Sequence, residues 1–171
     1  MKSPIKQMVF AAMCIAIGVV LPQFLHFIPN AGQVVLPMHI PVLVSGFICG
    51  PFYGLLTGIL TPILSHFIFG MPPAMMLPAM VFELAVYGLL TGLLYDYVGI
   101  KNEMVKNYVV LILAMLIGRV VYGLANAFIF KAGAYSVSVW VAAVFVTALP
   151  GIIIQLIIIP ALVMALKKLL R

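Results

Sequence analysis

The sequence is poor in charge, and poorest in negative charge. Of its 171 residues only 7% are charged, and Asp and Glu together number 3. A soluble globular domain is about 25% charged and about 45–50% apolar, whereas this chain is 66% hydrophobic. So little polar surface cannot cover so much apolar surface in water, and lipid must solvate much of the chain. The sequence therefore predicts an all-α membrane protein, with residues 1–171 forming a single integral membrane domain.

Cysteines and enzyme motifs are scarce as well. The two cysteines, Cys14 and Cys49, lie in separate apolar runs, as small buried hydrophobic residues do, and do not form a disulfide framework. The sequence contains no HExxH motif, no cysteine pair at zinc spacing and no glycine-rich phosphate loop. We therefore predict that this chain is not an enzyme, and that it has no catalytic residues, no metal site and no cofactor of its own.

Long apolar runs are what the sequence has in abundance. A helix needs about 20 apolar residues to cross a bilayer, and fewer when other helices surround it. The first run resembles a signal peptide, but no small-x-small cleavage site follows it, so we interpret it as a retained helix. Six membrane-spanning helices are predicted, at about Lys6–Phe24, Ile40–Cys49, Tyr53–Phe69, Pro78–Val98, Asn107–Phe130 and Val139–Leu166.

The connections between these spans carry the Pro and Gly residues. Between the first two spans lies HFIPNAGQVVLPMHIP, which lacks helical periodicity and indicates a long, structured loop or a re-entrant segment. Gly50 and Pro51 predict a tight turn between the second and third spans. The segment GMPPAMMLP, Gly70–Pro78, links the third span to the fourth, and Lys131–Ser138 links the fifth to the sixth.

The positive charges gather on one side of these six spans. With six crossings, both termini face the same side, and seven of the nine Lys and Arg residues lie there: Lys2, Lys6, Lys101, Lys106, Lys167, Lys168 and Arg171. Lys131 lies on the other side, and Arg119 lies within a span. The positive-inside rule therefore places both termini in the cytoplasm and the loop between helices 1 and 2 outside. No basic stripe remains for binding nucleic acid.

The stretch YGLLTG occurs twice, at Tyr53–Gly58 and at Tyr87–Gly92. Each copy carries a Gly-x-x-x-Gly spacing, which lets helix backbones approach closely. In the predicted topology both copies lie toward the cytoplasm, whereas an inverted duplication would place them at opposite depths. We interpret them as structural elements of a tightly packed inner half, to which Gly123 and Ala127 add a weaker version.

Polar residues recur at the depth of the outer half. Arg119, Tyr122 and Asn126 lie on one face of the fifth span, and Glu83 lies about five residues, or about 8 Å, from the outer end of the fourth. Charges at membrane depth are functional by default because they are costly to bury. The candidate substrate-binding residues are Glu83, Arg119, Asn126, His39, His66, Tyr122 and Gln155.

Several of these candidates also have a structural alternative. Glu83 and Arg119 can form an ion pair with no ligand, since Arg is long enough to reach outward. His39 and His66 can be histidines at helix or loop ends, and Tyr122 can be a packing or interface anchor, as can Trp140. The threonines of the third span can bond to their own helix backbone. Glu83 with both histidines could build a metal site, but the sequence does not set their geometry.

At this point the chain resembles a known family, the substrate-binding S components of energy-coupling factor (ECF) transporters. The resemblance rests on six spans in fewer than 200 residues, on the structured first outer loop, and on two sequence stretches. Ala12-Met-Cys-Ile-Ala16 matches the Ala-x-x-x-Ala motif with which S components dock on the shared transmembrane T subunit. LPMHIPVLVSGFICGPFYGLLTGILTPILS, Leu36–Ser65, is similar to the second and third helices of vitamin-specific members.

The resemblance implies a function and a set of partners. An S component captures a water-soluble vitamin or its precursor from outside, docks on a T subunit coupled to two ATPases, and topples in the prokaryotic cell membrane to release the substrate inward. ATP is then used by the partner subunits and not by this chain. A free Arg119 would favour an anion such as pantothenate, niacin or lipoate. An Arg119 neutralised by Glu83 would favour a neutral heterocycle such as pyridoxine or hydroxymethylpyrimidine. The pantothenate and pyridoxine types are preferred.

Two other classes of function compete with this hypothesis. A stand-alone secondary transporter or channel for a small metabolite would work without ATP. An intramembrane enzyme would need convergent catalytic groups, for which only Glu83 and the histidines qualify. Co-purification with a T subunit and ATPases would exclude both.

Overall fold

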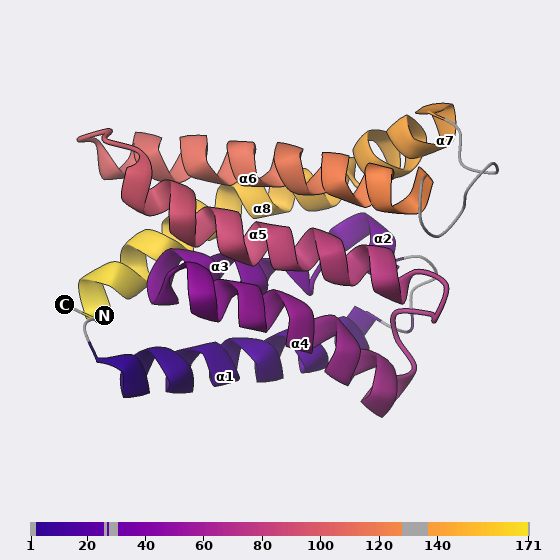
Figure 1. Cartoon of the computed structure of the whole chain (residues 1–171), viewed down its shortest axis with the longest axis horizontal. Helices are drawn as coiled ribbons and strands as arrows, with labels where there is room; N and C mark the ends of the chain where they lie inside the picture. The colour runs from indigo at the N-terminus through magenta and orange to yellow at the C-terminus, as the bar shows by residue number, and fades with distance from the viewer. Residues whose placement is uncertain (1–2, 26, 28–30, 128–136, 171) are drawn as a thin grey trace.

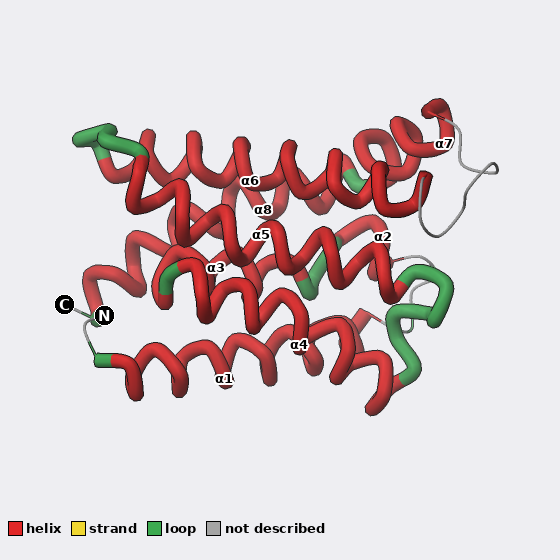
Figure 2. Tube along the Cα trace, viewed as in Figure 1, coloured by secondary structure: helices red, strands yellow, loops and turns green. Residues whose placement is uncertain are grey.

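The computed structural model describes residues 3–25, 27, 31–127 and 137–170. The described part is helical throughout, and its long helices run alongside one another in a bundle (Figure 1). Short loops join them at the two ends of the bundle (Figure 2). The elements are α1 (Pro4–Val20), the 3-10 turn η1 (Leu21–Leu25), α2 (Ala31–Val35), α3 (His39–Cys49), α4 (Pro51–Phe69), α5 (Leu77–Tyr97), α6 (Glu103–Ala125), α7 (Val137–Val141), the π-helical segment η3 (Ala142–Thr147) and α8 (Leu149–Leu169).

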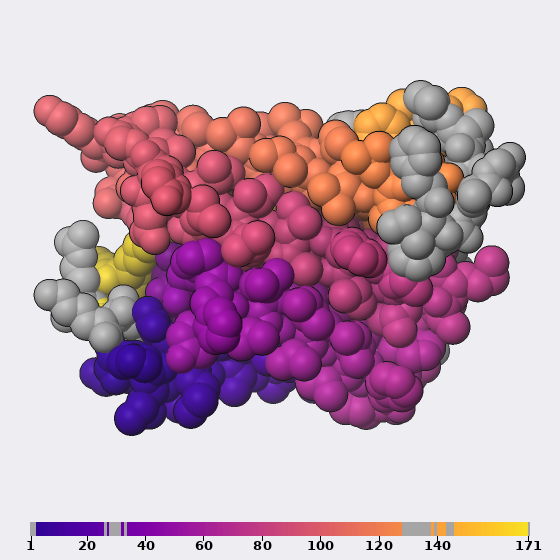
Figure 3. All heavy atoms as spheres, in the orientation of Figure 1, coloured from indigo at the N-terminus to yellow at the C-terminus, as the bar shows by residue number. Residues whose placement is uncertain are grey.

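Five segments are long and apolar enough to cross a membrane: Pro4–Leu25, Pro51–Phe69, Leu77–Tyr97, Glu103–Ala125 and Leu149–Leu169. They confirm a multi-pass membrane fold. The outer surface agrees, because Ile112, Leu116, Val120 and Leu124 recur every fourth residue along α6 and are exposed. In water such a stripe would be unfavourable, whereas lipid solvates it. Figure 3 shows the broad face that α4, α5 and α6 present together.

The sixth apolar helix, α3, is short and enclosed. Its 11 residues extend only about 17 Å at 1.5 Å per residue, less than the roughly 30 Å of a bilayer's hydrocarbon core. All of its residues except Ile40 are buried, and it contacts α1, α4, α5 and α8. The predicted second span is therefore the central helix of the bundle, and other helices surround it.

The predicted start of the fifth span was wrong for a local reason. The fifth span was expected to begin at Asn107, but α6 begins at Glu103. There the Asn102 side chain caps the helix by accepting hydrogen bonds from the backbone N–H groups of Met104 (3.0 Å) and Val105 (3.3 Å). This span was expected to end at Phe130, which lies outside the described residues. So does most of the predicted Lys131–Ser138 loop, whose last two residues already belong to α7.

The predicted sixth span, Val139–Leu166, is not one continuous α-helix. It is divided into α7, η3 and α8, and Ala148 caps the start of α8. Pro150 is the cause, because its ring nitrogen has no hydrogen to donate to the preceding turn, while a proline is well suited to the first turn of a new helix. The break lets α7 fold back over the end of α6 (Figure 1).

The two YGLLTG stretches pack against each other where α4 meets α5. A Cβ added to Gly54 would collide with the backbone of Gly88, and one added to Gly88 would collide with the backbone of Gly54. Gly58 likewise lies against the backbone of Leu84. The prediction of close packing is confirmed for these glycines. Gly123 behaves differently, since the space above it is filled by the Trp140 ring.

Both ends of the described chain lie at one end of the bundle, here called the terminal end (Figure 1). Gln7 of α1 and Leu170, just after α8, line one pocket there. Tyr95 connects three residues at this end. Its ring lies under two lysines, with Lys167 Nζ 3.1 Å and Lys106 Nζ 4.1 Å from the ring centroid, and its hydroxyl donates a hydrogen bond to Glu103. The opposite end, called the distal end, carries the starts of α3 and α5 and the ends of α4 and α6.

The predicted first loop contains a helix of its own. Its described part forms α2, which packs on α8, where the Val34 carbonyl lies against Gly151. Leu36 then adopts a left-handed backbone conformation with φ 55°, and its carbonyl accepts a hydrogen bond from the His39 N–H (3.1 Å). This turn brings the chain into α3 and places His39 at the first position of that helix.

Candidate functional site

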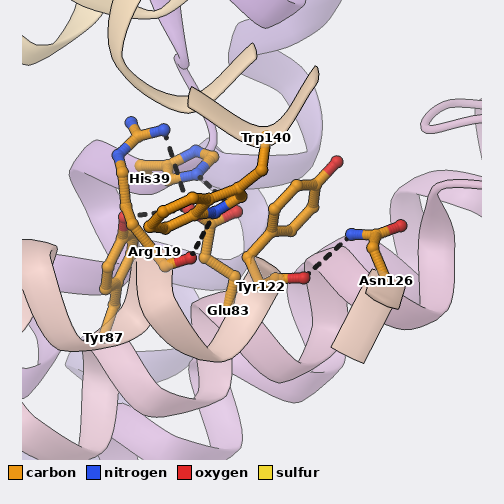
Figure 4. Close-up of polar contacts among 7 residues, drawn as sticks. All are labelled: His39, Glu83, Tyr87, Arg119, Tyr122, Asn126 and Trp140. Atoms are coloured by element: carbon orange, nitrogen blue, oxygen red, sulfur yellow. Dashed lines mark hydrogen bonds and ion pairs between the residues drawn. The ribbon is translucent and has the colours of Figure 1, made fainter. Parts of the chain in front are cut away.

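Three helices bring their charged and polar residues together around Glu83. The Tyr87 hydroxyl, one turn further along α5, donates to Glu83 Oε1 at 2.9 Å. Arg119 Nη1 from α6 lies 4.0 Å from the same oxygen, and His39 Nε2 from α3 lies 3.7 Å from Oε2. His39, Glu83 and Arg119 are only 2%, 5% and 4% exposed. The carboxylate is therefore the centre of a buried polar cluster (Figure 4).

The hydrogen bonds within this cluster do not use all of its donors. In the described part of the chain, Arg119 Nε and Nη2 are buried and have no hydrogen-bond partner, and the same holds for both ring nitrogens of His39. Leaving a buried donor unsatisfied costs about 1–3 kcal/mol, and more for a charged group. Such groups stand out in a native fold, where nearly all buried polar groups are paired. The cluster thus has hydrogen-bonding capacity for a further group.

Trp140 covers the backbone of α6 beside the cluster. Its indole Nε1 donates to the Arg119 carbonyl at 3.2 Å, and its ring packs on Gly123, where any side chain would collide with it. Figure 4 shows the indole lying over this part of α6, with Tyr122 nearby. Trp140 was expected from the sequence only as a packing or interface anchor. Its place beside the cluster could not be predicted, because the fold, and no local sequence pattern, brings α7 to α6.

Two further candidates are engaged elsewhere. The Asn126 amide donates to the Tyr122 carbonyl at 2.9 Å, a bond within its own helix end. His66 Nδ1 lies 2.7 Å from the Pro72 carbonyl and ties the end of α4 to the loop that follows. For His66 the observed bond matches the structural alternative, a histidine at a helix end. Neither of these two hydrogen bonds involves Glu83.

Gln155 lies on α8, one turn beyond Gly151. Its side chain is fully buried, and within the described residues neither its amide nitrogen nor its amide oxygen has a hydrogen-bond partner. An amide offers two donors and an acceptor, so this is a second place where buried polar capacity is unused. The helix packs on α2, α3 and α6, and two of these, α3 and α6, carry His39 and Arg119 of the Glu83 cluster.

Comparison with protein families identifies the chain. The model of the ECF transporter substrate-specific component matches residues 6–163. The chain belongs to this family. Comparisons with curated proteins and with solved structures gave no match. The resemblance drawn from the sequence is confirmed, and with it the assignment to membrane transport, since family members are substrate-binding subunits of transporters and not enzymes.

The first helix of this S component turns its Ala-x-x-x-Ala motif outward. Ala12 and Ala16 are exposed, whereas Ala11, Cys14 and Gly18 on the same helix face the bundle. Two small residues one turn apart leave a shallow surface onto which another helix can pack closely. This is the geometry that a docking motif needs.

The threonine stripe of the third predicted span serves the fold of the S component. Thr57 donates to the Tyr53 carbonyl (2.8 Å) and shares a 2.9 Å hydrogen bond with Ser45 of α3. Thr61 donates to the Thr57 carbonyl at 2.7 Å. These bonds match the expected bonding of threonines to their own helix. Ser65 differs, because its buried hydroxyl has no partner in the described part of the protein.

Proposed function

We propose that this S component captures a water-soluble vitamin or vitamin precursor, of the pantothenate or pyridoxine type, for ATP-driven uptake across the cell membrane of a prokaryote. The observation that carries the proposal is the buried cluster of His39, Glu83 and Arg119, found in a chain whose family supplies the substrate specificity of a transporter. Residues that specify a ligand are expected to be buried, polar and incompletely paired before it binds.

The proposed orientation places both termini in the cytoplasm and the cluster toward the outside, with six crossings that include the enclosed α3. Lys106 and Lys167 at the terminal end favour this orientation, because cytoplasmic ends of spans are rich in Lys and Arg. Glu83 and Arg119 lie nearer the distal end, since Glu83 is in the first third of α5 and Arg119 in the last third of α6. A ligand would then arrive from the outside.

In this proposal His39, Glu83 and Arg119 contact the ligand directly. Gln155 contributes its unused amide from α8, and Tyr122, Asn126 and His66 border the site nearer the distal end. The S component then docks through Ala12 and Ala16 on a T subunit that is coupled to two ATPases. The partners provide the energy, because the chain carries no ATP-binding motif.

The test is mass spectrometry of small molecules released by denaturing the detergent-purified protein, followed by uptake of the identified compound in vesicles. The expected result is one stoichiometric vitamin, taken up only when the T subunit, the ATPases and ATP are present. Uptake by the S component alone, driven by an ion gradient, would contradict the proposal and indicate a secondary transporter. A released product chemically altered by the protein would indicate an intramembrane enzyme.

A further inference from the structure

The guanidinium of Arg119 presents two different edges. Its Nη1 atom lies 4.0 Å from Glu83 Oε1, whereas Nε and Nη2 have no hydrogen-bond partner in the described part of the chain. The Nε–H and one Nη2–H bond leave the guanidinium side by side and in parallel. This fork matches the two oxygens of a carboxylate, which it binds bidentately. Glu83 therefore neutralises one end of Arg119 and leaves the fork unused.

Glu83 is held away from that fork by its other neighbours. The Tyr87 hydroxyl donates to Oε1 at 2.9 Å, and the His39 ring lies 3.7 Å from Oε2. A carboxylate fixed in this way cannot also turn to bind the Nε–Nη2 edge. A structural ion pair and direct ligand contact, which are alternatives when judged from the sequence, are compatible in this geometry.

Resting on the proposed function, we infer that the captured substrate is a monocarboxylate, and that its carboxylate binds the Nε–Nη2 edge of Arg119. Two acceptor oxygens at the right spacing satisfy both buried donors at once, with charge-assisted bonds about twice as strong as neutral ones. An alcohol or amide in the same place supplies one neutral acceptor and leaves a charged donor unsatisfied. The same inference excludes pyridoxine, which has no carboxylate.

The neighbouring Glu83 limits the substrate to one negative charge. It lies on the same guanidinium as the inferred carboxylate, so Arg119 already balances one anion within the buried cluster. A second negative group on the ligand would meet repulsion from Glu83, and Arg119 is the only Arg or Lys side chain that the described residues bring to the cluster. Dicarboxylates and phosphate esters are therefore expected to bind more weakly than the monocarboxylate.

The test compares matched pairs of ligands that differ only in the acid group: nicotinate with nicotinamide, pantothenate with pantothenol, and lipoate with lipoamide. Trp140 is the single tryptophan of the chain and donates to the Arg119 carbonyl, so its fluorescence reports on the site directly. Calorimetry repeats each titration. We expect the acid of one pair to bind at least about 100-fold more tightly than its neutral counterpart.

Two variants distinguish the contribution of the bidentate Arg119 fork from that of its positive charge. Arg119→Lys keeps the charge but lacks the fork, and should weaken binding of the acid roughly 10- to 100-fold. Glu83→Gln combined with Arg119→Gln keeps the cluster neutral, so it should fold while binding the acid no better than its neutral counterpart. Lys101→Gln, which removes an exposed cation from the α5–α6 loop, is the matched control and should bind like the unmodified protein.

The outcomes distinguish this inference from the proposed function. If the neutral member of a pair, or pyridoxine, binds as tightly as any acid, the substrate class is wrong while vitamin capture stands. If Arg119→Lys or the double variant binds the acid with unchanged affinity, the fork does not hold the carboxylate. If no vitamin of either class binds or is released on denaturation, the proposed function itself fails, and this inference with it.

Discussion

Helix α5 contributes both to the interface of the two YGLLTG stretches and to the cluster around Glu83. The two regions differ in how closely they pack and in how completely their polar groups are hydrogen-bonded. Where Gly54 meets Gly88, backbones touch with no room for a methyl group, and the nearby Thr57 and Thr91 hydroxyls donate to carbonyls of their own helices. Around Glu83, buried donors lack partners among the described residues. The glycine interface is closely packed and its threonine hydroxyls are hydrogen-bonded. In the described part of the chain, the Glu83 cluster contains buried donors that are free to bind a further group.

The difference shows how a membrane fold can position a cluster of buried polar groups that is energetically unfavourable to bury. Tyr87 belongs to both regions, because it begins the second YGLLTG stretch and its hydroxyl donates to Glu83. Its ring also fills the space that a side chain at Gly118 would occupy. Close packing between α4, α5 and α6 therefore fixes the positions from which the polar groups extend.

The largest effect is expected from breaking the glycine interface. Gly88→Leu would push a side chain into the backbone of Gly54, which cannot yield as a flexible side chain can. We expect the free energy of unfolding to fall by about 3 kcal/mol or more, seen as loss of the monodisperse peak in size-exclusion chromatography. Gly99→Ala is the control, since nothing lies within 4 Å of a Cβ there. Normal behaviour of Gly88→Leu would contradict the close packing described here.

Replacing the exposed alanines of α1 is expected to have a large effect on assembly with the T subunit and little effect on ligand binding. Ala12→Trp with Ala16→Trp should abolish co-purification with the T subunit and leave ligand affinity within about twofold, because this face lies outside both compared regions. Ile112→Trp places the same bulk on the exposed face of α6 and should assemble normally. A double variant that still assembles would remove Ala12 and Ala16 from the docking surface.

An intermediate effect, on ligand affinity, is expected at only one of the two tyrosines that begin the YGLLTG stretches. Tyr87→Phe removes the hydroxyl that donates to Glu83 and keeps the ring, so ligand affinity should fall roughly 10-fold. Tyr53→Phe removes a hydroxyl that donates to the Pro4 carbonyl at 3.3 Å and should leave affinity unchanged. Titration of both variants is the measurement, and equal losses would mean that the Glu83 bond is not what matters.

The smallest effect is a loss of stability, expected when the hydrogen bond between Thr57 and Ser45 is removed. Thr57→Val removes the bond shared with Ser45 and leaves that buried hydroxyl without this partner. Stability should fall by about 1 kcal/mol, measured as a lower midpoint of thermal unfolding, with ligand affinity unchanged. A loss of affinity comparable to that of Tyr87→Phe would show that the two regions are coupled through α4.

Much of this architecture could be predicted from the sequence, because apolar runs and rare charges are strong signals in a membrane protein. Glu83 and Arg119 were predicted as site residues for that reason, and the structure pairs them. The contribution of Trp140 depends on α7 folding back over α6, which no local pattern encodes. The start of α6 was missed because a single capping residue, Asn102, extends it beyond its apolar run. Tyr87 was overlooked because its repeat indicated packing alone.

The shortness of α3 has a consequence for how the protein is made. A helix of 11 residues is too short to enter the bilayer as an independent span. It is joined to α4 by Gly50, whose φ of 87° reverses the chain at once. We therefore expect the two helices to leave the translocon together, as one helical hairpin, with α3 sheltered from lipid by α4 until α5 and α8 arrive. Biogenesis of this protein would then be cooperative from α3 onward.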